Sequence, residues 1–594
     1  MASLPRTALF EAISKHDPQS TAVIHSLSGR TFTYGSLLKD VAAAKQRLAQ
    51  NAGKDEKDMR GERIAFLVEN SYDYVVTLLS ILGSNAIAVP LSPGFPPHEL
   101  SYILDQSGAL MLLSSAKFSA KAEEVLKEEL EQKPIHAKVE KIAEGKTEGE
   151  NPKLEDVAQE DDKGGMMLYT SGTTNRPKGV LLPQSVLTAQ SQSLYQAWHY
   201  TPSDHLLHVL PLHHIHGTVN AILTPLLAGS TIEFMFPFTV DAVFNRFAAP
   251  FLRSNGSSKK APITFFTVVP TIYKRLQDGH KSLSPEMREA TRTAFKPENL
   301  RLNISGSAAL PTPTKMAWAE LSGGNILLER YGMTEVGMAL SCGLANEDRV
   351  DGSVGWPLPS VTARLVDSDT HEVIEPGQEL DKDGKERHGE IQLKGPTIFR
   401  EYWRNPTATA SEFTPDGFFK TGDVAVRRAV EGAGTGASGS WAKGPMAQER
   451  RHHQDGRRKV SALEVEREML SLPQISECAV VGLPSETWGQ KVAAVVVLSS
   501  EGQTGGRGGK PYGAMDLRRA LKDRLVAYKI PQDMKVVESI PRNAMGKINK
   551  KNLVKEVFGE LESIRRRSVD LAEERKRLKA GEGDRTLGGE VKST

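Results

Sequence analysis

A loop rich in serine, threonine and glycine, held between two apolar runs, is the feature that most constrains this sequence. The loop reads T-S-G-T-T-N-R-P-K-G over residues 170–179, with an apolar run from Gly165 to Tyr169 before it and another from Val180 to Leu182 after it. Small residues let backbone N–H groups come close to phosphate oxygens, and the hydroxyls add further donors. Lys178 adds a mobile positive charge. The sequence therefore predicts a phosphate-binding loop.

The same composition is also usual in a polar surface turn. Pro177 stiffens the chain just before Lys178, and this combination favours a phosphate site over a plain turn. The order G-x-x-x-x-G-K-[ST] of a Walker A loop is absent, so a different kind of phosphate site is expected.

Length and composition limit the class of protein. A chain of 594 residues is expected to form more than one domain. A net charge of +2 gives no argument for binding nucleic acid or an anionic membrane. The two cysteines, Cys342 and Cys478, lie far apart and predict a reducing compartment with no disulfide framework. We find no apolar run of about 18 residues, no secretory signal and no C-terminal S-K-L, and we expect a cytoplasmic or mitochondrial protein without a transmembrane segment.

Alternating strand and helix patterns predict an α/β fold. Arg63–Val68 and Ala86–Pro90 have the pattern of buried strands, and the apolar helix predicted at Tyr72–Leu82 makes them a βαβ unit. A second helix and strand follow over Pro96–Ser114. Residues 116–163 are charged and poorly periodic, and we expect helix and exposed loop there, peripheral to the chemistry.

Histidines follow the predicted strand His205–Leu212, in the sequence H-H-I-H-G at residues 213–217. Their spacing does not fit a zinc-binding helix, and no cysteine or acidic ligand is close in sequence. We expect a histidine at this strand end to line a substrate pocket. The alternative is a histidine whose hydrogen bonds are satisfied within the core.

Two later strand ends carry candidate ligand-binding residues. Arg301–Leu310 is a strand that runs into a turn of small residues, where a flat ring can lie against the backbone. A short strand from Ile326 leads into Tyr331–Glu335, whose aromatic, hydroxyl and carboxylate groups can stack a base, bind a phosphate and hold a cation. Mg²⁺ binds through one or two carboxylates plus substrate phosphates, so Glu335 alone is sufficient. Without the other motifs, this one would be interpreted as a surface Thr–Glu pair.

Two further candidates lie towards the end of the chain. Asp423 follows a glycine and suits acceptance from two ribose hydroxyls, although a plain Gly–Asp turn has the same sequence. Residues 461–560 have their own pattern of helices and strands, which predicts a separate α+β domain of about 100 residues. Lys547 lies on a glycine-bearing loop near its end and, taken alone, would be a solvated surface lysine.

These motifs, in this order, resemble the acyl-adenylate-forming (AMP-binding) superfamily over residues 10–560. Within the superfamily, the chain is most similar to the malonyl-CoA synthetases, the malonate–CoA ligases. The runs that carry this similarity are P-L-H-H-I-H-G (211–217), S-G-S-A-A-L-P (305–311), L-E-R-Y-G-M-T-E (328–335), K-V-S-A-L-E-V-E (459–466) and E-T-W-G-Q (486–490).

The resemblance implies an AMP-forming acid–CoA ligase that uses ATP, Mg²⁺ and coenzyme A. A carboxylate attacks the α-phosphate of ATP, which gives acyl-AMP and pyrophosphate, and the CoA thiolate then displaces AMP. The protein must neutralise charge at the α-phosphate and hold the reactants in line. The implied fold is a large N-terminal adenylation domain with βαβ subdomains and mixed sheets (1–424), a linker and hinge (425–459), a small mobile α+β domain (460–560) and a charged, disordered tail (561–594).

The resemblance also implies a role for each matching residue. The phosphate ligands would be Thr170, Ser171, Gly172, Thr173, Thr174, Lys178 and Thr334, with Glu335 as the Mg²⁺ ligand. The residues around the adenosine and the pocket beside it would be Ser307, Ala308, Tyr331, Gly332 and Asp423. The catalytic set would be Lys547, Thr334, Glu335 and His214, with His214 at the acyl site and Lys547 reaching the carboxylate and the α-phosphate.

The second carboxylate of malonate needs a cationic partner. Arg301 is the candidate from sequence, because strand alternation places it on the same face as Asn303 and Ser305. The alternative is a surface arginine at the start of a strand.

One segment departs from the family. Residues 449–458 read E-R-R-H-H-Q-D-G-R-R, where the family has an apolar strand and a hinge that read about S-V-D-I-I-K-T-G-G. A coding sequence for residues 449–458 encodes S-V-D-I-I-K-T-G-G when it is read one base later, so we interpret the segment as a frameshifted form of the hinge. The alternative is a genuinely divergent linker. A defective hinge would impair the second half-reaction more than the first.

Other functions stay open at this point. The acid could be oxalate or a fatty acid, since residues of the acyl pocket are scattered along the chain. An adenylating enzyme that passes the acyl group to a carrier protein would form the adenylate without a CoA thioester. A hinge-defective protein would be limited to the first half-reaction or to binding nucleotide. The predicted partners are a small carboxylic acid, ATP and CoA, with no nucleic acid, and the sequence does not identify a partner protein.

Overall fold

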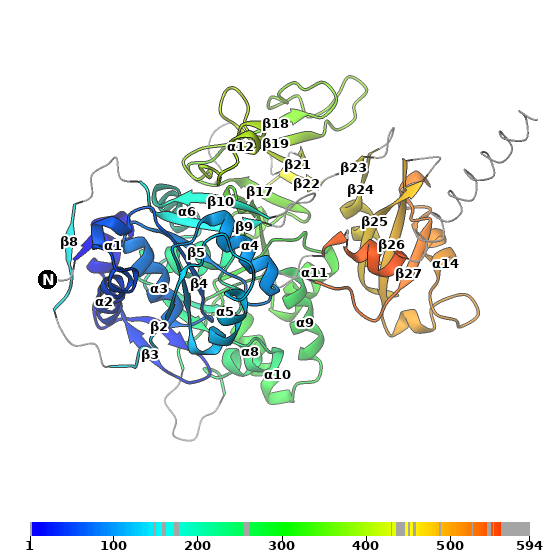
Figure 1. Cartoon of the computed structure of the whole chain (residues 1–594). Coiled ribbons are helices and arrows are strands. Elements are labelled where there is room, and N and C mark those ends of the chain that lie inside the picture. Colours follow the sequence, from blue (N-terminus) through cyan, green and yellow to red (C-terminus); the bar gives the residue numbers. More distant parts are fainter. Residues whose placement is uncertain are drawn as a thin grey trace, which may run out of the picture. The chain divides into compact units, whose positions relative to one another are not determined.

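The computed structural model of the chain describes residues 3–559 except 146–149, 157–161, 171–176, 253–259, 429, 435–445, 450–451, 455–458, 486–488, 526, 543–547 and 551. The chain divides into two compact units, residues 1–450 and residues 451–594 (Figure 1). The boundary between the units lies within the predicted linker, residues 425–459. The predicted tail, residues 561–594, is outside the described residues.

A sheet of seven strands forms one layer of the first unit. The strand order is β20-β10-β9-β5-β4-β6-β7. The strands are β4 Arg63–Leu67, β5 Ile87–Pro90, β6 Met111–Ser114, β7 Ile135–Lys138, β9 Gly165–Thr170, β10 Lys178–Pro183 and β20 Glu401–Tyr402. The predicted βαβ unit is confirmed, since helix α3, Tyr72–Gly83, joins the parallel neighbours β4 and β5. Strand β7 lies where only helix and loop are predicted, because its short, polar sequence has no strand pattern.

A mixed sheet of thirteen strands forms the other large layer. Its order is β18-β19-β21-β22-β17-β16-β15-β14-β13-β11-β12-β2-β3. The strands are β2 Thr21–His25, β3 Thr31–Thr33, β11 His205–His208, β12 Thr231–Phe234, β13 Phe265–Val268, β14 Leu302–Ser305, β15 Leu328–Met333, β16 Gly337–Ser341, β17 Ser353–Pro357, β18 Thr362–Asp367, β19 Gly389–Lys394, β21 Phe419–Arg427 and β22 Met446–Glu449. From β2 to β15 the neighbouring strands of this sheet are parallel, so their carboxyl ends meet at one edge.

Helices join these strands throughout the first unit. They are α1 Ala8–Lys15, α2 Tyr34–Ala52, α4 Pro97–Ser107, α5 Ser119–Val125, α6 Gln184–Ala197, α7 Thr224–Ala228, α8 Val240–Ala248, α9 Pro270–His280, α10 Pro285–Phe295, α11 Thr312–Leu321 and α12 Pro406–Glu412. A separate pair of short strands, β1 Ser3–Pro5 and β8 Lys153–Glu155, runs parallel. Among the described residues, no helix combines the length and apolar character needed to cross a bilayer.

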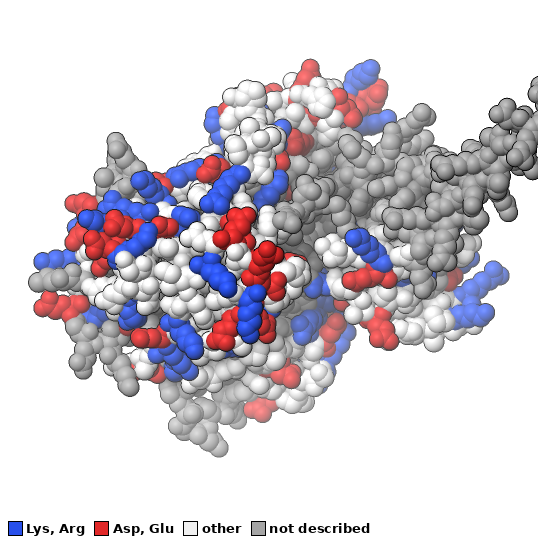
Figure 2. All heavy atoms as spheres, viewed as in Figure 1, with Lys and Arg blue, Asp and Glu red and all other residues white. Residues whose placement is uncertain are grey.

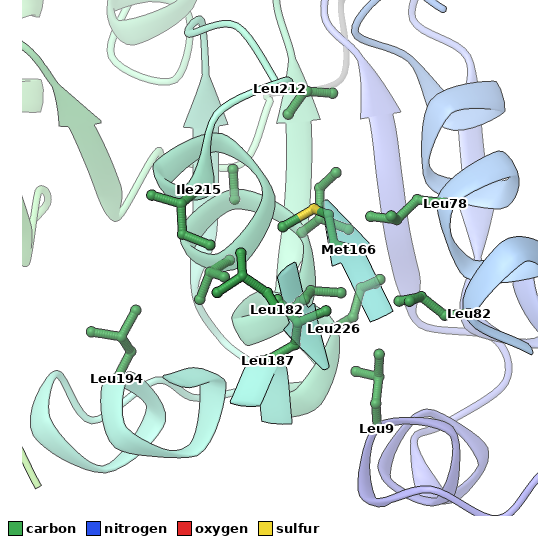
Figure 3. Close-up of a cluster of buried hydrophobic side chains, with 14 of the residues drawn as sticks. Leu9, Leu78, Leu82, Met166, Leu182, Leu187, Leu194, Leu212, Ile215 and Leu226 are labelled. Carbon is green, nitrogen blue, oxygen red and sulfur yellow. The ribbon is translucent and has the colours of Figure 1, made fainter. Parts of the chain in front are cut away.

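One hydrophobic core extends between the two large sheets of the first unit. Every residue of α3 is buried, including the polar Asp73, Thr77 and Ser80 among its mostly apolar side chains. Figure 3 shows Leu78 and Leu82 of α3 directed towards Met166 of β9, in a cluster that also includes leucines of α1, α6 and α7. Charged side chains of both signs are interspersed over the face of the molecule that Figure 2 shows. The core, rather than a charged surface, organises this unit.

The second unit is a small α+β domain, as predicted. Strand β25, Ile475–Ser485, is antiparallel to β26, Gly489–Leu498, and β27, Asp533–Val536, is parallel to β26. Alternate residues of β25 and β26 belong to two hydrophobic clusters, one that includes helix α13, Ala462–Leu470, and another that includes Leu553 and Phe558. Helix α14, Ala514–Leu521, completes the first cluster. The fold class predicted from the sequence is therefore confirmed in both units.

Parts of the predicted linker are strands. Strand β21 continues through Arg427, and β22 pairs with both β21 and β17 in the first unit. Strand β23, His452–Gln454, pairs with β24, Lys459–Ser461, in the second unit. The remaining residues of the segment that departs from the family, 450–451 and 455–458, lie outside the described residues.

The packing of α3 generates a test of the core. Leu78 has no exposed surface, whereas Leu27 is 62% exposed. We expect Leu78→Ala to lower the free energy of unfolding by about 2–5 kcal/mol, since it removes buried methyl groups and leaves a cavity. The matched Leu27→Ala should change it by less than about 0.5 kcal/mol. Urea unfolding followed by tryptophan fluorescence measures both, and equal effects would contradict the position of α3.

Candidate active site

The candidate site lies at the edge of the large sheet where the parallel strands end. The histidine sequence follows β11, Ser307 follows β14, and Tyr331 lies in the carboxyl half of β15. Open α/β sheets bind ligands at the carboxyl ends of their strands. The topology thus brings three of the sequence motifs to one edge.

The histidine segment is built by a close backbone approach and an unusual helix. A π-helical segment begins at His216, and π-helical turns are frequent at functional sites. A side chain on Gly217 would collide with the carbonyl of Pro211, so the position requires glycine. The rings of His213 and His214 lie 4.2 Å apart, centroid to centroid. Burial lowers the pKa of His213 to about 4, so this ring is neutral at pH 7.

The buried side chain of Arg330 joins these motifs. Arg330 is only 5% exposed, and its Nη2 donates a hydrogen bond to Ser307 Oγ at 3.2 Å and contacts His216 Nδ1. A guanidinium can only donate, so His216 carries its proton on Nε2, which donates to Thr267 Oγ1 at 2.9 Å. The sequence motifs contain Arg330 directly before Tyr331, but a basic residue inside a buried strand gives no periodic signal of its own.

The turn after β14 is shaped around this arginine. Ser307 has a φ of +66°, a left-handed conformation that non-glycine residues rarely adopt. A Cβ on Gly306 would come within 2.5 Å of the guanidinium carbon of Arg330. Ala308 follows in the same turn, after Ser307. The small residues predicted to face a flat ring therefore also leave space for the arginine.

Two residues predicted for the nucleoside are in direct contact. The hydroxyl of Tyr331 donates to Asp423 Oδ2 at 2.9 Å, although the residues lie on β15 and β21. Asp423 lies inside strand β21 and not in the plain Gly–Asp turn that was the alternative, and its backbone N–H donates to Thr421 Oγ1 at 3.1 Å. A side chain on Gly332 would collide with the carbonyl of Gly337 across the β15–β16 hairpin. The hairpin thus requires a glycine beside Tyr331.

Tyr402 contacts both Lys178, a predicted phosphate ligand, and Glu335, the predicted Mg²⁺ ligand. Thr170 and Lys178 face each other at the base of the phosphate loop, in the β9–β10 register. Glu335, 9% exposed, lies after Thr334 in the turn between β15 and β16. Tyr402 donates to Glu335 Oε1 at 3.0 Å, and Lys178 Nζ lies 4.6 Å from the centre of the Tyr402 ring. Ser171, Gly172, Thr173, Thr174 and Lys547 lie outside the described residues.

Glu335 fits a cation that arrives together with phosphates. Within the described residues, no three histidine, cysteine, aspartate or glutamate side chains gather as a metal cage. Mg²⁺ keeps few protein ligands and takes most of its other oxygens from substrate phosphates and water. One buried carboxylate, joined through Tyr402 to Lys178, is therefore a suitable protein contribution.

The position of Arg301 corrects the sequence-based prediction that it faces the substrate. Arg301 lies before the first residue of β14, at the amino end of the strand, whereas Ser307 follows the carboxyl end. Its guanidinium forms a bidentate ion pair with Asp204, with Nε donating to Oδ1 at 3.0 Å and Nη2 donating to Oδ2 at 2.8 Å. The guanidinium also donates to the backbone carbonyl of Trp198. Strand alternation predicts a face of the strand but does not say which end of the strand lies near the substrate.

Comparison with known proteins gives concordant findings. A family model described as AMP-binding enzyme matches residues 10–403, and one described as AMP-binding enzyme C-terminal domain matches residues 464–547. A protein of Gibberella moniliformis named CoA ligase is 59% identical, over 98% of this chain and 99% of that protein. The mitochondrial malonate–CoA ligase ACSF3 of Mus musculus is 37% identical, over 89% of this chain and 87% of that protein. The crystal structure of ATP-bound MatB from Rhodopseudomonas palustris superposes with a TM-score of 0.73 at 29% identity, over 92% of this chain and 98% of that one.

The pairing of Arg301 leads to a prediction. Arg301→Leu leaves the carboxylate of Asp204 without its guanidinium, and we expect a loss of about 1–3 kcal/mol in unfolding free energy, between the costs of exposed and buried pairs. The KM values for ATP and for the acid should stay within about twofold, because the residue lies at the opposite end of β14 from Ser307. Thermal unfolding and initial-rate kinetics measure the two effects. A large rise in the KM for the acid, with stability unchanged, would restore Arg301 to the site.

Proposed function

The chain belongs to the AMP-binding enzyme family as an acid–CoA ligase, and we propose that the acid it activates is malonate. The substrates are then malonate, ATP with Mg²⁺, and coenzyme A. A malonate carboxylate oxygen attacks the α-phosphorus, the bond from that phosphorus to the bridging oxygen breaks, and pyrophosphate leaves. The CoA thiolate next attacks the acyl carbon, and AMP leaves as the thioester forms.

The cluster of Arg330, Ser307 and His216 carries the choice of malonate. It places a buried guanidinium, a hydroxyl and an imidazole together at the strand ends where the acyl group is predicted. A guanidinium matches the geometry of a carboxylate, and their attraction is strong where water is excluded. The second carboxylate of malonate would bind here, which makes Arg330 the cationic partner in place of Arg301. The relative from Mus musculus is named malonate–CoA ligase, which supports malonate as the acid.

The rest of the site is proposed to hold the nucleotide. Thr170, Ser171, Gly172, Thr173, Thr174 and Lys178 would bind the β- and γ-phosphates, and Thr334 the α-phosphate. Glu335 would hold Mg²⁺, which when bound neutralises phosphate charge. Asp423 would accept from the ribose hydroxyls, while Tyr331, Ser307 and Ala308 would border the adenine.

Negative charge develops at the α-phosphate during the first step, and Lys547 is proposed to stabilise it. His214 is proposed to border the acyl group. Neutral His213 beside it adds no charge to the pocket. Lys547 and His214 would contribute by holding the two negatively charged reactants, the acid and ATP, in line for the attack.

Two alternatives are distinguished by separate assays of the half-reactions. A protein whose hinge is impaired at residues 449–458 would release pyrophosphate but form little thioester. An enzyme that passes the acyl group to a carrier protein would form the adenylate but no thioester with free CoA. Cytoplasm or mitochondria remains the prediction for location, and the mouse relative is named as mitochondrial.

Arg330 provides the test of the substrate. We expect Arg330→Met to reduce kcat/KM for malonate by at least about 30-fold, corresponding to the lower end of the roughly 2–5 kcal/mol that loss of a buried charge partner costs. The KM for ATP should change by less than about threefold, and kcat/KM for the monocarboxylate propionate should not fall. Steady-state kinetics on wild-type and variant proteins measure these values.

Arg301→Leu is the matched control for this test, since it removes another arginine, directly before the neighbouring strand β14. A parallel measurement of ATP binding shows whether Arg330→Met remains folded. If the folded variant loses malonate and propionate activity equally, Arg330 does not select the dicarboxylate and the assignment of malonate loses its main support.

A further inference from the structure

A short segment, residues 399–403, connects the antiparallel strand pair β9–β10, which flanks the predicted phosphate-binding loop, with the predicted metal ligand Glu335. On one side, the Arg400 N–H donates to Leu181 O at 3.0 Å and the Trp403 N–H donates to Gly179 O at 2.7 Å, both on β10. On the other side, the Phe399 N–H donates to Glu335 O at 2.8 Å. The segment therefore fixes the backbone of Glu335 relative to the strand that begins with Lys178.

Within this segment, Tyr402 repeats the connection through its side chain. It is 5% exposed, and its hydroxyl donates to Glu335 Oε1 at 3.0 Å. The face of its ring lies 4.6 Å from Lys178 Nζ, a distance at which a cation and an aromatic ring attract. Tyr402 pairs with Val180 in the β10–β20 register, and its ring packs against Phe399 with centroids 4.9 Å apart. These contacts leave the tyrosine little freedom to turn.

A hydrogen bond to one carboxylate oxygen restricts the orientation of the carboxylate. Groups that orient a metal ligand in this way typically change metal affinity by about 10–100-fold when they are removed. The ring has a separate effect, because it holds the ammonium group of Lys178 near the loop that is predicted to bind phosphates. One side chain thus acts on both charged residues.

We propose that Tyr402 is a positioning residue that aligns Glu335 for Mg²⁺ and Lys178 for the phosphates of ATP. The proposal rests on the proposed function, since it assumes that Glu335 holds the metal. Tyr402 itself contacts neither the metal nor the nucleotide. Its hydroxyl serves Glu335 and its ring serves Lys178, so the two parts can be removed separately.

Binding measurements on the full chain test the proposal without turnover. The probe is Mn²⁺, and electron paramagnetic resonance follows the signal of the unbound ion. The protein is saturated with α,β-methylene-ATP, an analogue whose methylene bridge prevents adenylation of the acid. We expect Tyr402→Phe to raise the Mn²⁺ dissociation constant about 10-fold, while the metal-free affinity for the analogue, measured by calorimetry, stays within about twofold. Tyr402→Leu should raise the Mn²⁺ constant and also weaken metal-free binding, because Lys178 loses its ring.

Tyr34→Phe is the matched control. Tyr34 is also buried, and its hydroxyl donates to Ser230 O at 2.8 Å rather than to a carboxylate. This variant should lose a comparable hydrogen bond and some thermal stability without changing either dissociation constant. A change in Mn²⁺ affinity that Tyr34→Phe shares would indicate a general loss of structure and would overturn the proposal.

Glu335→Gln separates failure of this inference from failure of the proposed function. If Glu335→Gln weakens Mn²⁺ binding and Tyr402→Phe does not, the positioning role is wrong while the metal assignment stands. If Glu335→Gln leaves Mn²⁺ affinity unchanged, Glu335 is not the metal ligand, and the proposed arrangement of ATP fails together with the inference.

Discussion

The buried guanidinium of Arg330 is the group around which the site is assembled. It meets Ser307 after β14 and His216 after β11, while its own strand continues through Tyr331 and is followed by Glu335 in the next turn. A buried charge is costly unless hydrogen-bonding groups surround it. The left-handed Ser307 and the collision that a Cβ at Gly306 would cause show how the backbone makes room for it. The requirement to accommodate this charge explains why small residues cluster at that turn.

Much of the fold could be predicted from the sequence because it depends on local pattern. Apolar runs such as Arg63–Val68 and Tyr72–Leu82 give β4 and α3 almost to the residue. Site residues were harder to predict, because alternation along a strand defines a face but not which end lies near a ligand. Arg301 and Ser307 are six positions apart, roughly 20 Å in an extended chain, so they lie at opposite ends of β14. Arg330 and Tyr402 act through contacts distant in sequence, which no local pattern reveals.

In the second unit, an ion pair connects helix α13 with the chain that follows Lys547 in sequence. Glu466 of α13 accepts from the Val480 N–H at 2.8 Å and pairs with Lys550 Nζ at 2.7 Å. This pair ties the chain just after Lys547 to the helix that follows residues 449–458.

The central claim is that the site selects an acid by its second carboxylate. The most direct measurement compares malonate with monomethyl malonate as substrates of the wild-type protein, by pyrophosphate release in the first half-reaction. The two acids have nearly the same shape at the reacting end, but the ester lacks the second charge. We expect kcat/KM for the ester to be lower by at least about 30-fold, since it cannot pair with the buried Arg330. Equal values for the two acids would contradict the claim and would direct the search to monocarboxylic substrates.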